Sequence, residues 1–402
     1  MFRRDFLTAA SAASLVSLAG RAPSLLAAAA ATASSTDRVV VVIQLTGGND
    51  GLNMVVPYAD DEYHRRRPTL HYTADQVHRL NDKIGLHPSM EKFAVLCREG
   101  KAAVVQGVGY PQPNRSHFES MDLWHSAHGT GAMRQTGWLG RWLDEKSESS
   151  RSHSLGAVHV GSDSLPHALW SRSQPAVSMQ SLDSMRLPQL KDYGATIDRL
   201  LESKSGNGDT SLLQRVAEQS RIAVATSRSL SQAGQMGTAR SDYPGGPLAE
   251  RLHAIARMIC ADMPARVYYV TLDGFDTHAS QQNAHAALLG QLSDSVAAFT
   301  EDLKSFGHED RVRMMIFSEF GRRVQENASR GTDHGAAGPV LIVGDPSLPM
   351  VLGKQPNLHE LDADGDLKFQ IDYRRVYATV LGHWLSVESE SLLGGHFDPL
   401  LA

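Results

Sequence analysis

The stretch DRVVVVIQLTGGNDGLN, residues 37–53, decides the fold class of this chain. Its run from Val39 to Leu45 is almost entirely apolar and β-branched, without the alternation of a strand that is exposed on one face. This pattern predicts a strand buried on both faces, which is typical of the middle of a parallel sheet. The strand is expected to stop at a pair of glycines, directly before the polar residues Asn49 and Asp50.

Further strands and helices are expected to alternate on the C-terminal side of this stretch. Apolar runs predict strands at 101–109, 155–162, 266–274, 311–319 and 339–345. Helical patterns lie between them or after them, at 87–100, 117–127, 137–145, 210–232, 247–262, 280–305 and 372–385. This alternation predicts an α/β protein with a doubly wound, mainly parallel central sheet. In such sheets, ligands bind beyond the carboxyl ends of the strands.

Composition excludes several classes of protein. The chain has 402 residues, with 42% hydrophobic and 21% charged residues, as in an ordinary soluble globular protein. Its formal net charge of -5 gives no basic field that would gather nucleic acid. Its two cysteines, Cys97 and Cys260, have no CxxC neighbour, which excludes a cysteine-rich zinc site but leaves a single bridge open. The 18 histidines are numerous, and they indicate metal or acid–base chemistry.

The N-terminus predicts an export signal. RRDFL at 3–7 is followed by a mild apolar stretch and a run of small residues, as in a twin-arginine signal peptide. We expect residues 1–31 to be this signal and 32–402 to form one domain, in which the irregular region 163–245 is a candidate cap over the site. The protein is then expected in the periplasm or outside the cell, and no segment of the mature chain is long enough to span a membrane. The alternative is that the N-terminus forms a basic amphipathic helix of the mature protein.

Polar side chains follow four of the expected strands at the point where each strand ends. They are Asp50 after the first strand, Arg115, Ser116 and His117 after 101–109, Asp273, Asp276 and His278 after 266–272, and Glu319, Arg322 and Arg323 after 311–317. The loop GTDHG at 331–335 adds Asp333 and His334. Because the carboxyl ends of parallel strands meet at one edge, we expect these groups to converge.

Such a mixture of carboxylates and imidazoles without thiolates favours a divalent ion over a structural zinc site. We expect one or two ions of zinc, manganese, magnesium or calcium. Two ions about 4 Å apart suit phosphoryl or sulfuryl transfer. Ser116, at an expected helix N-terminus, is then the candidate nucleophile, and Arg115 or Arg322 would bind the non-bridging oxygens of the transferred group.

Each of these groups also has a purely structural interpretation. Asp50 follows two glycines and would serve as a turn residue. Ser116 with Glu119 fits a capping box, and Asp276 fits an N-cap of the helix at 280–305. Glu319 and Arg322 fit an ion pair at a helix start. The common placement after strands favours the site.

A set of short motifs resembles an exported bacterial family, domain of unknown function 1501. The motifs are GGNDGLN, VVPY, RPTL, LHPSM, SHF, GWLGR, GFDTH, SEFGRR, GTDHG and RRVYATVL, and they span residues 38 to about 386. That family is placed with the alkaline phosphatase and sulfatase superfamily. The resemblance therefore implies an alkaline-phosphatase-like fold and a metal-dependent site, but it does not supply a substrate.

The resemblance also implies roles for particular residues. Asp50 would hold one metal ion, and Glu319 would stand where an acid of that site usually lies. Asp276 and His278 would match the Asp…His pair at the second metal ion. His334 would be the late histidine ligand, with Asp333 beside it, and Ser116 would be the nucleophile. This sequence departs from the superfamily pattern at two points. Asp276 and His278 are two residues apart instead of four, and Glu319-Phe320 stands where Asp-His is usual. A metal ligand is therefore in doubt: His117 or Asp333 would replace it, or the site would hold a single metal ion or none.

These observations leave two main hypotheses. The first is an exported metal-dependent hydrolase or transferase for small phosphate or sulfate esters. The second is a catalytically degenerate member of the superfamily that serves as an exported binding or assembly protein with a protein partner. An exported oxidoreductase is a third reading, but GGNDGLN lacks the GxGxxG spacing of a dinucleotide loop.

Overall fold

The structure, a computed structural model, describes residues 38–128, 135–150, 155–182 and 241–401. The expected signal peptide at 1–31, the expected helix at 210–232 and most of the expected cap region lie outside these residues. From Val39 onward the chain forms one compact unit. Among the described helices, none is long and apolar enough to cross a membrane.

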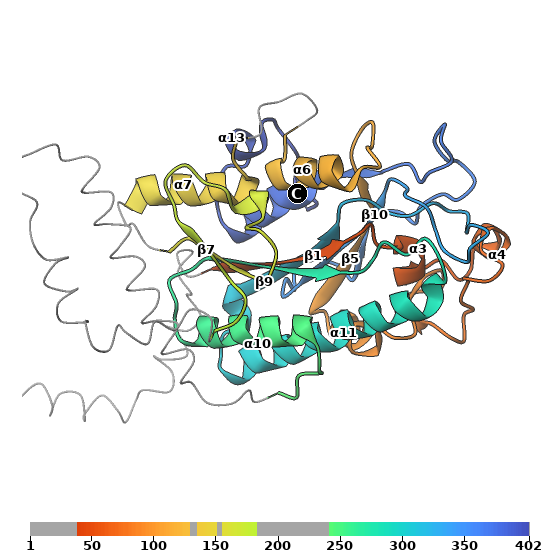
Figure 1. Ribbon diagram of the computed structural model, residues 1–402, viewed down its shortest axis with the longest axis horizontal. Coiled ribbons are helices and arrows are strands. Elements are labelled where there is room, and N and C mark those ends of the chain that lie inside the picture. The colour runs from red at the N-terminus through yellow and green to blue at the C-terminus, as the bar shows by residue number, and fades with distance from the viewer. Residues whose placement is uncertain (1–37, 129–134, 151–154, 183–240, 402) are drawn as a thin grey trace, which may run out of the picture. The chain divides into compact units, whose positions relative to one another are not determined.

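A large mixed sheet forms the middle of this unit (Figure 1). In the described part of the chain it has nine strands, ordered β11-β5-β10-β9-β1-β8-β6-β7, with β12 also paired to β5. The strands are β1 (Val39–Thr46), β5 (Ala102–Gly109), β6 (Ala157–Val160), β7 (Ala176–Met179), β8 (Val267–Asp273), β9 (Val312–Ser318), β10 (Gly338–Val343), β11 (Val351–Leu352) and β12 (Ile371–Asp372). The α/β class and the mainly parallel sheet are confirmed.

The opening stretch forms β1 at the centre of this sheet. Ile43 is in parallel register with Val270 of β8 on one side and with Ile316 of β9 on the other. β10 runs antiparallel to both β9 and β5, so β5 runs in the same direction as β1. The carboxyl ends of β1, β5, β8 and β9 therefore lie on the same edge of the sheet, as expected.

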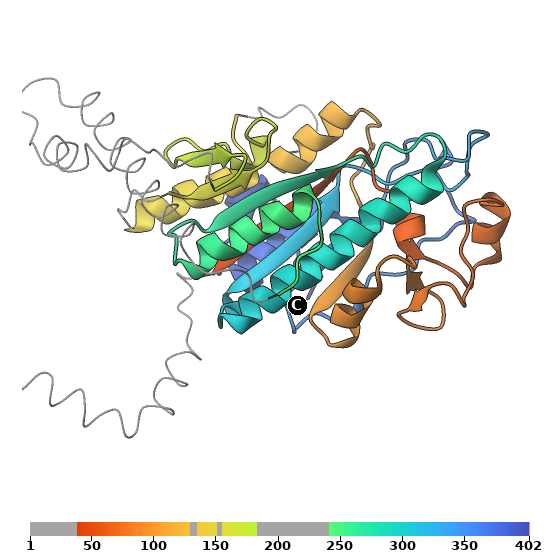
Figure 2. The ribbon, with the colours of Figure 1, turned by 60° about the horizontal axis from the view of Figure 1, so that its bottom comes forward.

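Helices cover both faces of the sheet, which explains why β1 has no polar face (Figures 1 and 2). One face carries α5 (Glu91–Arg98), α10 (Pro247–Cys260) and α11 (Gln281–Ser305), whose apolar residues share one hydrophobic cluster with Val41 and Ile43. The other face carries α6 (His117–Ser126), α7 (Trp138–Ser150), α12 (Tyr373–Thr379), which continues into a π-turn at Val380–Trp384, and α13 (Glu390–Leu393). Their apolar residues share a second cluster with Val40 and Val42. Burying each of these side chains contributes about 1.5–3 kcal/mol.

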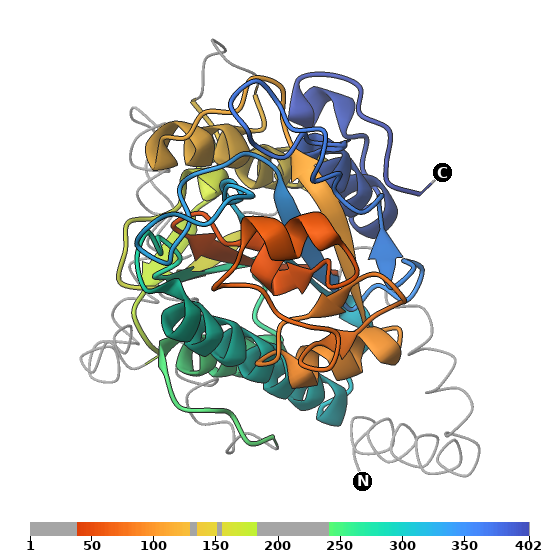
Figure 3. The ribbon, with the colours of Figure 1, turned by 90° about the vertical axis from the view of Figure 1, so that its right-hand side faces the viewer.

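The sequence did not predict the smaller elements. A three-stranded sheet of β2 (Val55–Val56), β3 (His78–Arg79) and β4 (Gly85–Leu86) lies with α3 (Gly51–Met54) and α4 (Asp61–Arg66), in the orange and red segments of Figure 3. The 3-10 turns His167–Leu169 and Glu309–Arg311 complete the described elements. Strands of two residues carry no readable periodicity, so pattern analysis cannot find them. Cys97 and Cys260 are not bridged to each other in the structure, so the disulfide that the sequence left open is not formed.

Candidate metal centre

Four side chains from three separate loops meet at the carboxyl edge of the sheet. His117 begins α6 after β5, Asp276 and His278 follow β8, and His334 lies in the GTDHG loop before β10. One ligand atom from each of His117, Asp276 and His334 can be chosen so that all three lie within 4.8 Å of one another. We call these four side chains the metal cluster.

The distances within the metal cluster are short enough for the groups to bind one small cation. Asp276 Oδ1 lies 3.0 Å from His278 Nε2 and 3.1 Å from His334 Nε2. The two Nε2 atoms are themselves 3.0 Å apart, and His117 Nε2 is 3.7 Å from Asp276 Oδ2. Ligands about 2.0–2.1 Å from a tetrahedral zinc ion are separated by roughly 3.3–3.5 Å, within the range of these distances.

The outer nitrogen of each histidine in the cluster bonds to an oxygen. His117 Nδ1 lies 2.8 Å from Glu319 Oε1, and His278 Nδ1 lies 3.0 Å from Asp333 Oδ1. His334 Nδ1 lies 2.9 Å from the backbone carbonyl oxygen of Arg115. A carbonyl or carboxylate oxygen can only accept, so each Nδ1 carries the hydrogen. A neutral imidazole then presents the lone pair of Nε2 to the inside of the cluster.

This arrangement is the one that metal-bound histidines have in proteins. Arg322 donates to Asp276 Oδ1 and lies 3.4 Å from His278 Nε2, and the Nε2 lone pairs of His117 and His334 face the same carboxylate. A divalent ion bound by His117, Asp276 and His334 would satisfy these three groups, with His278 beside them. Three nitrogen donors and one oxygen donor fit zinc or another transition metal better than magnesium or calcium, which prefer oxygen.

The local electrostatics keep the acids of the site ionised. Burial raises the pKa of Asp276, but the hydrogen bonds from Arg322 and His334, together with the nearby charges of Arg322 and His278, outweigh it and the pKa falls to about 2. The hydrogen bond from His278 lowers the pKa of Asp333. The hydrogen bond to Glu319 raises the pKa of His117, which makes this imidazole a more basic ligand.

The loop GTDHG reaches the cluster because it pairs with the segment after β9. Arg322 and His334 form an isolated antiparallel bridge, and the backbone N–H of Arg323 donates to Asp333 O at 3.0 Å. A Cβ atom at Gly331 would lie 2.3 Å from a backbone atom of His278, and one at Gly335 would lie 2.6 Å from a backbone atom of Arg322. Glycine is needed here for close backbone approach, whereas the sequence suggested a tight bend.

Ser116 lies between two residues that build the cluster. It precedes α6, but its side chain makes no capping bond, and Asn114 Oδ1 accepts its backbone N–H at 2.7 Å. The capping box with Glu119 is therefore not formed. The hydroxyl of Ser116 makes no hydrogen bond with any residue that the structure describes, and the residue is exposed.

A family model described as protein of unknown function (DUF1501) matches residues 37–393. The chain belongs to this family. None of the curated proteins matches the chain by sequence.

Solved structures similar to this DUF1501 protein include a sulfatase and two other exported or ester-cleaving proteins. PsFucS1 sulfatase from Pseudoalteromonas sp. has 11% identity and a TM-score of 0.39, covering 90% of this chain and 70% of its own. The C-terminal periplasmic domain of EcEptC from Escherichia coli has 9% identity and a TM-score of 0.38, with coverages of 91% and 87%. The phosphonate monoester hydrolase SpPMH from Silicibacter pomeroyi has 10% identity and a TM-score of 0.34, with coverages of 89% and 77%.

The structure places Arg322 differently from the sequence interpretation, in which it binds the transferred group. Its side chain is 1% exposed and donates to Gly48 O at 2.6 Å, Thr332 O at 2.7 Å and Asp276 Oδ1 at 2.7 Å. It donates as well to the carbonyl oxygens of Gly47 and Phe275. The guanidinium group is therefore hydrogen-bonded within the protein instead of to a substrate, because the loops after β1 and β8 surround it with oxygen atoms.

Arg115 is also engaged within the protein. Its guanidinium pairs with the buried carboxylate of Asp366 and lies 3.3 Å from Asp364. Its contribution to the cluster is the backbone carbonyl group that accepts from His334. The sequence could not reveal this pairing, because Arg115 and Asp366 are separated by 251 positions.

Asp50 and Glu319 lie outside the metal cluster. Asp50 is fully buried, and its Oδ2 accepts from Arg67 Nη1 at 2.6 Å and from Gln281. Glu319 accepts from His117 and from the backbone N–H of Gly47 at 2.9 Å. Asp333 lies behind His278. Of the six residues predicted as metal ligands, three belong to the cluster, namely Asp276, His278 and His334. Glu319 and Asp333 lie behind its histidines, and Asp50 is paired with Arg67.

His117 is the member of the cluster that we had considered only as a replacement ligand. The signal for it was present, because SHF follows a buried strand at a helix start. It was ambiguous because Ser116 in the same motif fits both a nucleophile and a cap.

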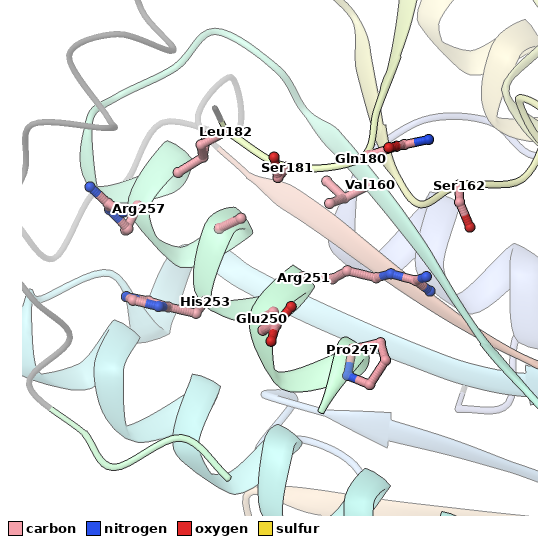
Figure 4. Close-up of a pocket in the computed structure, with 11 residues that line it drawn as sticks. Val160, Ser162, Gln180, Ser181, Leu182, Pro247, Glu250, Arg251, His253 and Arg257 are labelled. Carbon is pink, nitrogen blue, oxygen red and sulfur yellow. The ribbon is translucent and has the colours of Figure 1, made fainter. Parts of the chain in front are cut away.

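A separate cavity of about 360 Å³ lies along α10 and does not include the cluster (Figure 4). Its walls include Val160, Gln180 and Leu182 on one side and Glu250, Arg251 and His253 of α10 on the other.

Proposed function

We propose that this DUF1501 protein is an exported, metal-dependent hydrolase or transferase that acts on phosphate or sulfate esters. One observation carries the proposal. Three histidines are each fixed through Nδ1 by an oxygen acceptor and direct Nε2 at a single carboxylate, Asp276. His117, Asp276, His278 and His334 would hold the metal ion.

Ser116 is the candidate nucleophile in this proposal. Its hydroxyl has no partner among the described residues, and its neighbours on both sides contact the cluster. The N–H groups in the first turn of α6 are not taken by a capping side chain of Ser116, so they could stabilise negative charge on a bound ester. A bound divalent ion would supply Lewis-acid polarisation and lower the pKa of an adjacent hydroxyl group.

The proposed location is the periplasm or the outside of the cell. The twin-arginine motif at 3–7 supports it, since that export route carries folded proteins, which can already hold a metal ion. Cell fractionation of the full chain and of an Arg3→Lys, Arg4→Lys variant tests the location. Retention of the variant in the cytoplasm is expected, and unchanged export of the variant would contradict the twin-arginine interpretation.

Metal analysis of the purified chain, together with a screen of phosphate and sulfate esters, tests the activity. We expect bound zinc or a similar metal, and turnover that is lost in Ser116→Ala. The matched control is Ser329→Ala, an exposed serine in the loop that leads to GTDHG. A protein without metal, or a Ser116→Ala variant with undiminished turnover, would refute the proposal.

The second candidate function is an exported binding or assembly protein in which the metal ion supports folding. One observation favours it: the arginines expected to bind a tetrahedral anion, Arg115 and Arg322, are both engaged by the protein. In that case the metal ion is present but no ester is cleaved. A Ser116→Ala variant that keeps its metal ion and still binds its exported partner would favour this function.

A further inference from the structure

The strand ends of this fold carry more acids than the metal cluster uses, and two buried arginines neutralise part of the surplus. Arg322 lies directly behind Asp276, and Arg67 pairs with Asp50. We propose that these two guanidinium groups stand where a second metal ion would otherwise be needed, so that the protein holds one metal ion per chain. This inference concerns the metal cluster of the proposed function, but it does not depend on ester chemistry.

Arg322 is bound as a hard cation is bound, by oxygen atoms from several loops. Backbone carbonyl groups of Gly47, Gly48, Phe275 and Thr332 surround it together with Asp276 Oδ1. Its Nη1 also lies 3.4 Å from His278 Nε2. These partners take up its N–H groups, and the residue is 1% exposed. Arg322 therefore acts as a fixed positive charge that positions Asp276, without contact to a substrate.

The negative charge of Asp50 is already neutralised in this arrangement. Its carboxylate and the Arg67 guanidinium are both completely buried, and they lie 2.6 Å apart. Arg67 is held in turn by Asn53 Oδ1 at 2.7 Å and by the carbonyl oxygen of Val324 at 3.0 Å. A metal ion on Asp50 would have to bind Oδ1, which is buried without a hydrogen-bond partner among the described residues, and would add a second positive charge where Arg67 already neutralises the carboxylate.

Charge balance around the metal cluster leads to the same number of ions. The nearby formal charges are the carboxylates of Asp276, Asp333 and Glu319, the guanidinium group of Arg322, and that of Arg323, which acts on Asp333, because each imidazole is neutral when it binds a metal ion. Three carboxylates and two guanidinium groups leave one negative charge, so one divalent ion is sufficient to neutralise it. A second ion in the same partly buried space would leave an excess of positive charge, which is costly in a medium of low dielectric constant.

Metal stoichiometry tests this inference. The full chain is stripped with a chelator, incubated with excess zinc, desalted and analysed for zinc and protein. We expect one zinc ion per chain, none in Asp276→Asn and still one in Asp50→Asn. Two zinc ions per chain in the unaltered protein, or loss of bound zinc in Asp50→Asn, would overturn the inference.

The Asp50→Asn variant leaves Arg67 buried without its counter-charge, so it is paired with an Asp50→Asn, Arg67→Met variant that removes both charges. Circular dichroism identifies which variants are folded, and the unaltered chain gives a decisive count in either case. If one zinc ion is bound but no ester is cleaved, the inference stands and the proposed activity fails. If two are bound and esters are cleaved, the reverse holds.

Discussion

Replacement of Glu319 by glutamine separates the two roles that this acid could have. The resemblance implies that Glu319 is a metal ligand, whereas the structure has its Oε1 bonded to His117 Nδ1 at 2.8 Å. Glutamine keeps an acceptor for His117 and for the backbone N–H of Gly47, and its amide group can donate to Ser318 Oγ, which lies 3.0 Å from Glu319 Oε2. Only the negative charge behind the imidazole is lost.

We expect Glu319→Gln to weaken zinc binding by about 10–100-fold, the usual effect of mutating the hydrogen-bond partner behind a metal-bound histidine. This corresponds to about 1.4–2.7 kcal/mol of binding free energy. The physical reason is that the hydrogen bond to Glu319 raises the pKa of His117 and thus its strength as a ligand. Zinc affinity is measured by titration against a competing chelator, with the stoichiometry recorded in the same experiment.

The control is Glu301→Gln, which makes the same change of charge at an exposed position of α11. Glu301 lies 20 residues after the start of α11, or about 30 Å along the helix, well beyond the screening length of about 10 Å. An affinity in Glu319→Gln equal to that of the control would show that His117 does not need the negative charge of Glu319. Complete loss of stoichiometric zinc would show instead that Glu319 binds the metal directly.

Three further predictions concern stability. When free zinc is at 100 times its Kd, its removal should lower the free energy of unfolding by about 2.7 kcal/mol. If a chelator leaves the melting temperature unchanged, the result argues against a bound ion. Ser318→Ala should cost about 1–3 kcal/mol in urea unfolding relative to exposed Ser347→Ala, because Ser318 Oγ accepts from Asn49 N–H at 2.9 Å and lies 2.7 Å from Leu45 O. Burial lowers the pKa of His125 to about 3 and that of His285 to about 4. Between about pH 6.5 and 4 the unfolded chain therefore binds more protons than the folded chain, and the free energy of unfolding should decrease as the pH falls. The decrease is up to about 1.4 kcal/mol per pH unit for each histidine. In His125→Gln this slope, measured by urea unfolding at several pH values, should be shallower, and an unchanged slope would mean that His125 does not contribute.

The main elements of the fold could be predicted from the sequence because they are long. The strand from Val39 and the helix at 280–305 each bury a continuous or periodic apolar pattern, and both were found near their observed bounds. By contrast, β7 was missed because it has only four residues and an exposed serine. The antiparallel direction of β10 was also missed, because no residue pattern within a buried strand records the direction of its neighbours.

The candidate site followed from the same reasoning, up to a limit. Strand ends mark an edge of a parallel sheet, so Asp276, His278 and His334 could be grouped without any knowledge of distances. The grouping could not separate a metal ligand from an acid that lies behind one. Asp50, for example, has the position of a ligand in sequence, but Arg67 neutralises it in the structure.

The sequence by itself therefore determined the α/β class, the central strand, the edge that carries the chemistry and most residues of the metal cluster, because each depends on local apolar patterns and on residues next to them. Only the tertiary structure decided which groups face one another. Arg322 and Asp276, 46 positions apart, and Arg115 and Asp366, 251 positions apart, form pairs through loops that have no periodicity. The direction of an imidazole is likewise set by its acceptor, as Glu319 sets that of His117 across 202 positions. Such pairings arise from packing, and the identity of a residue does not reveal its partner.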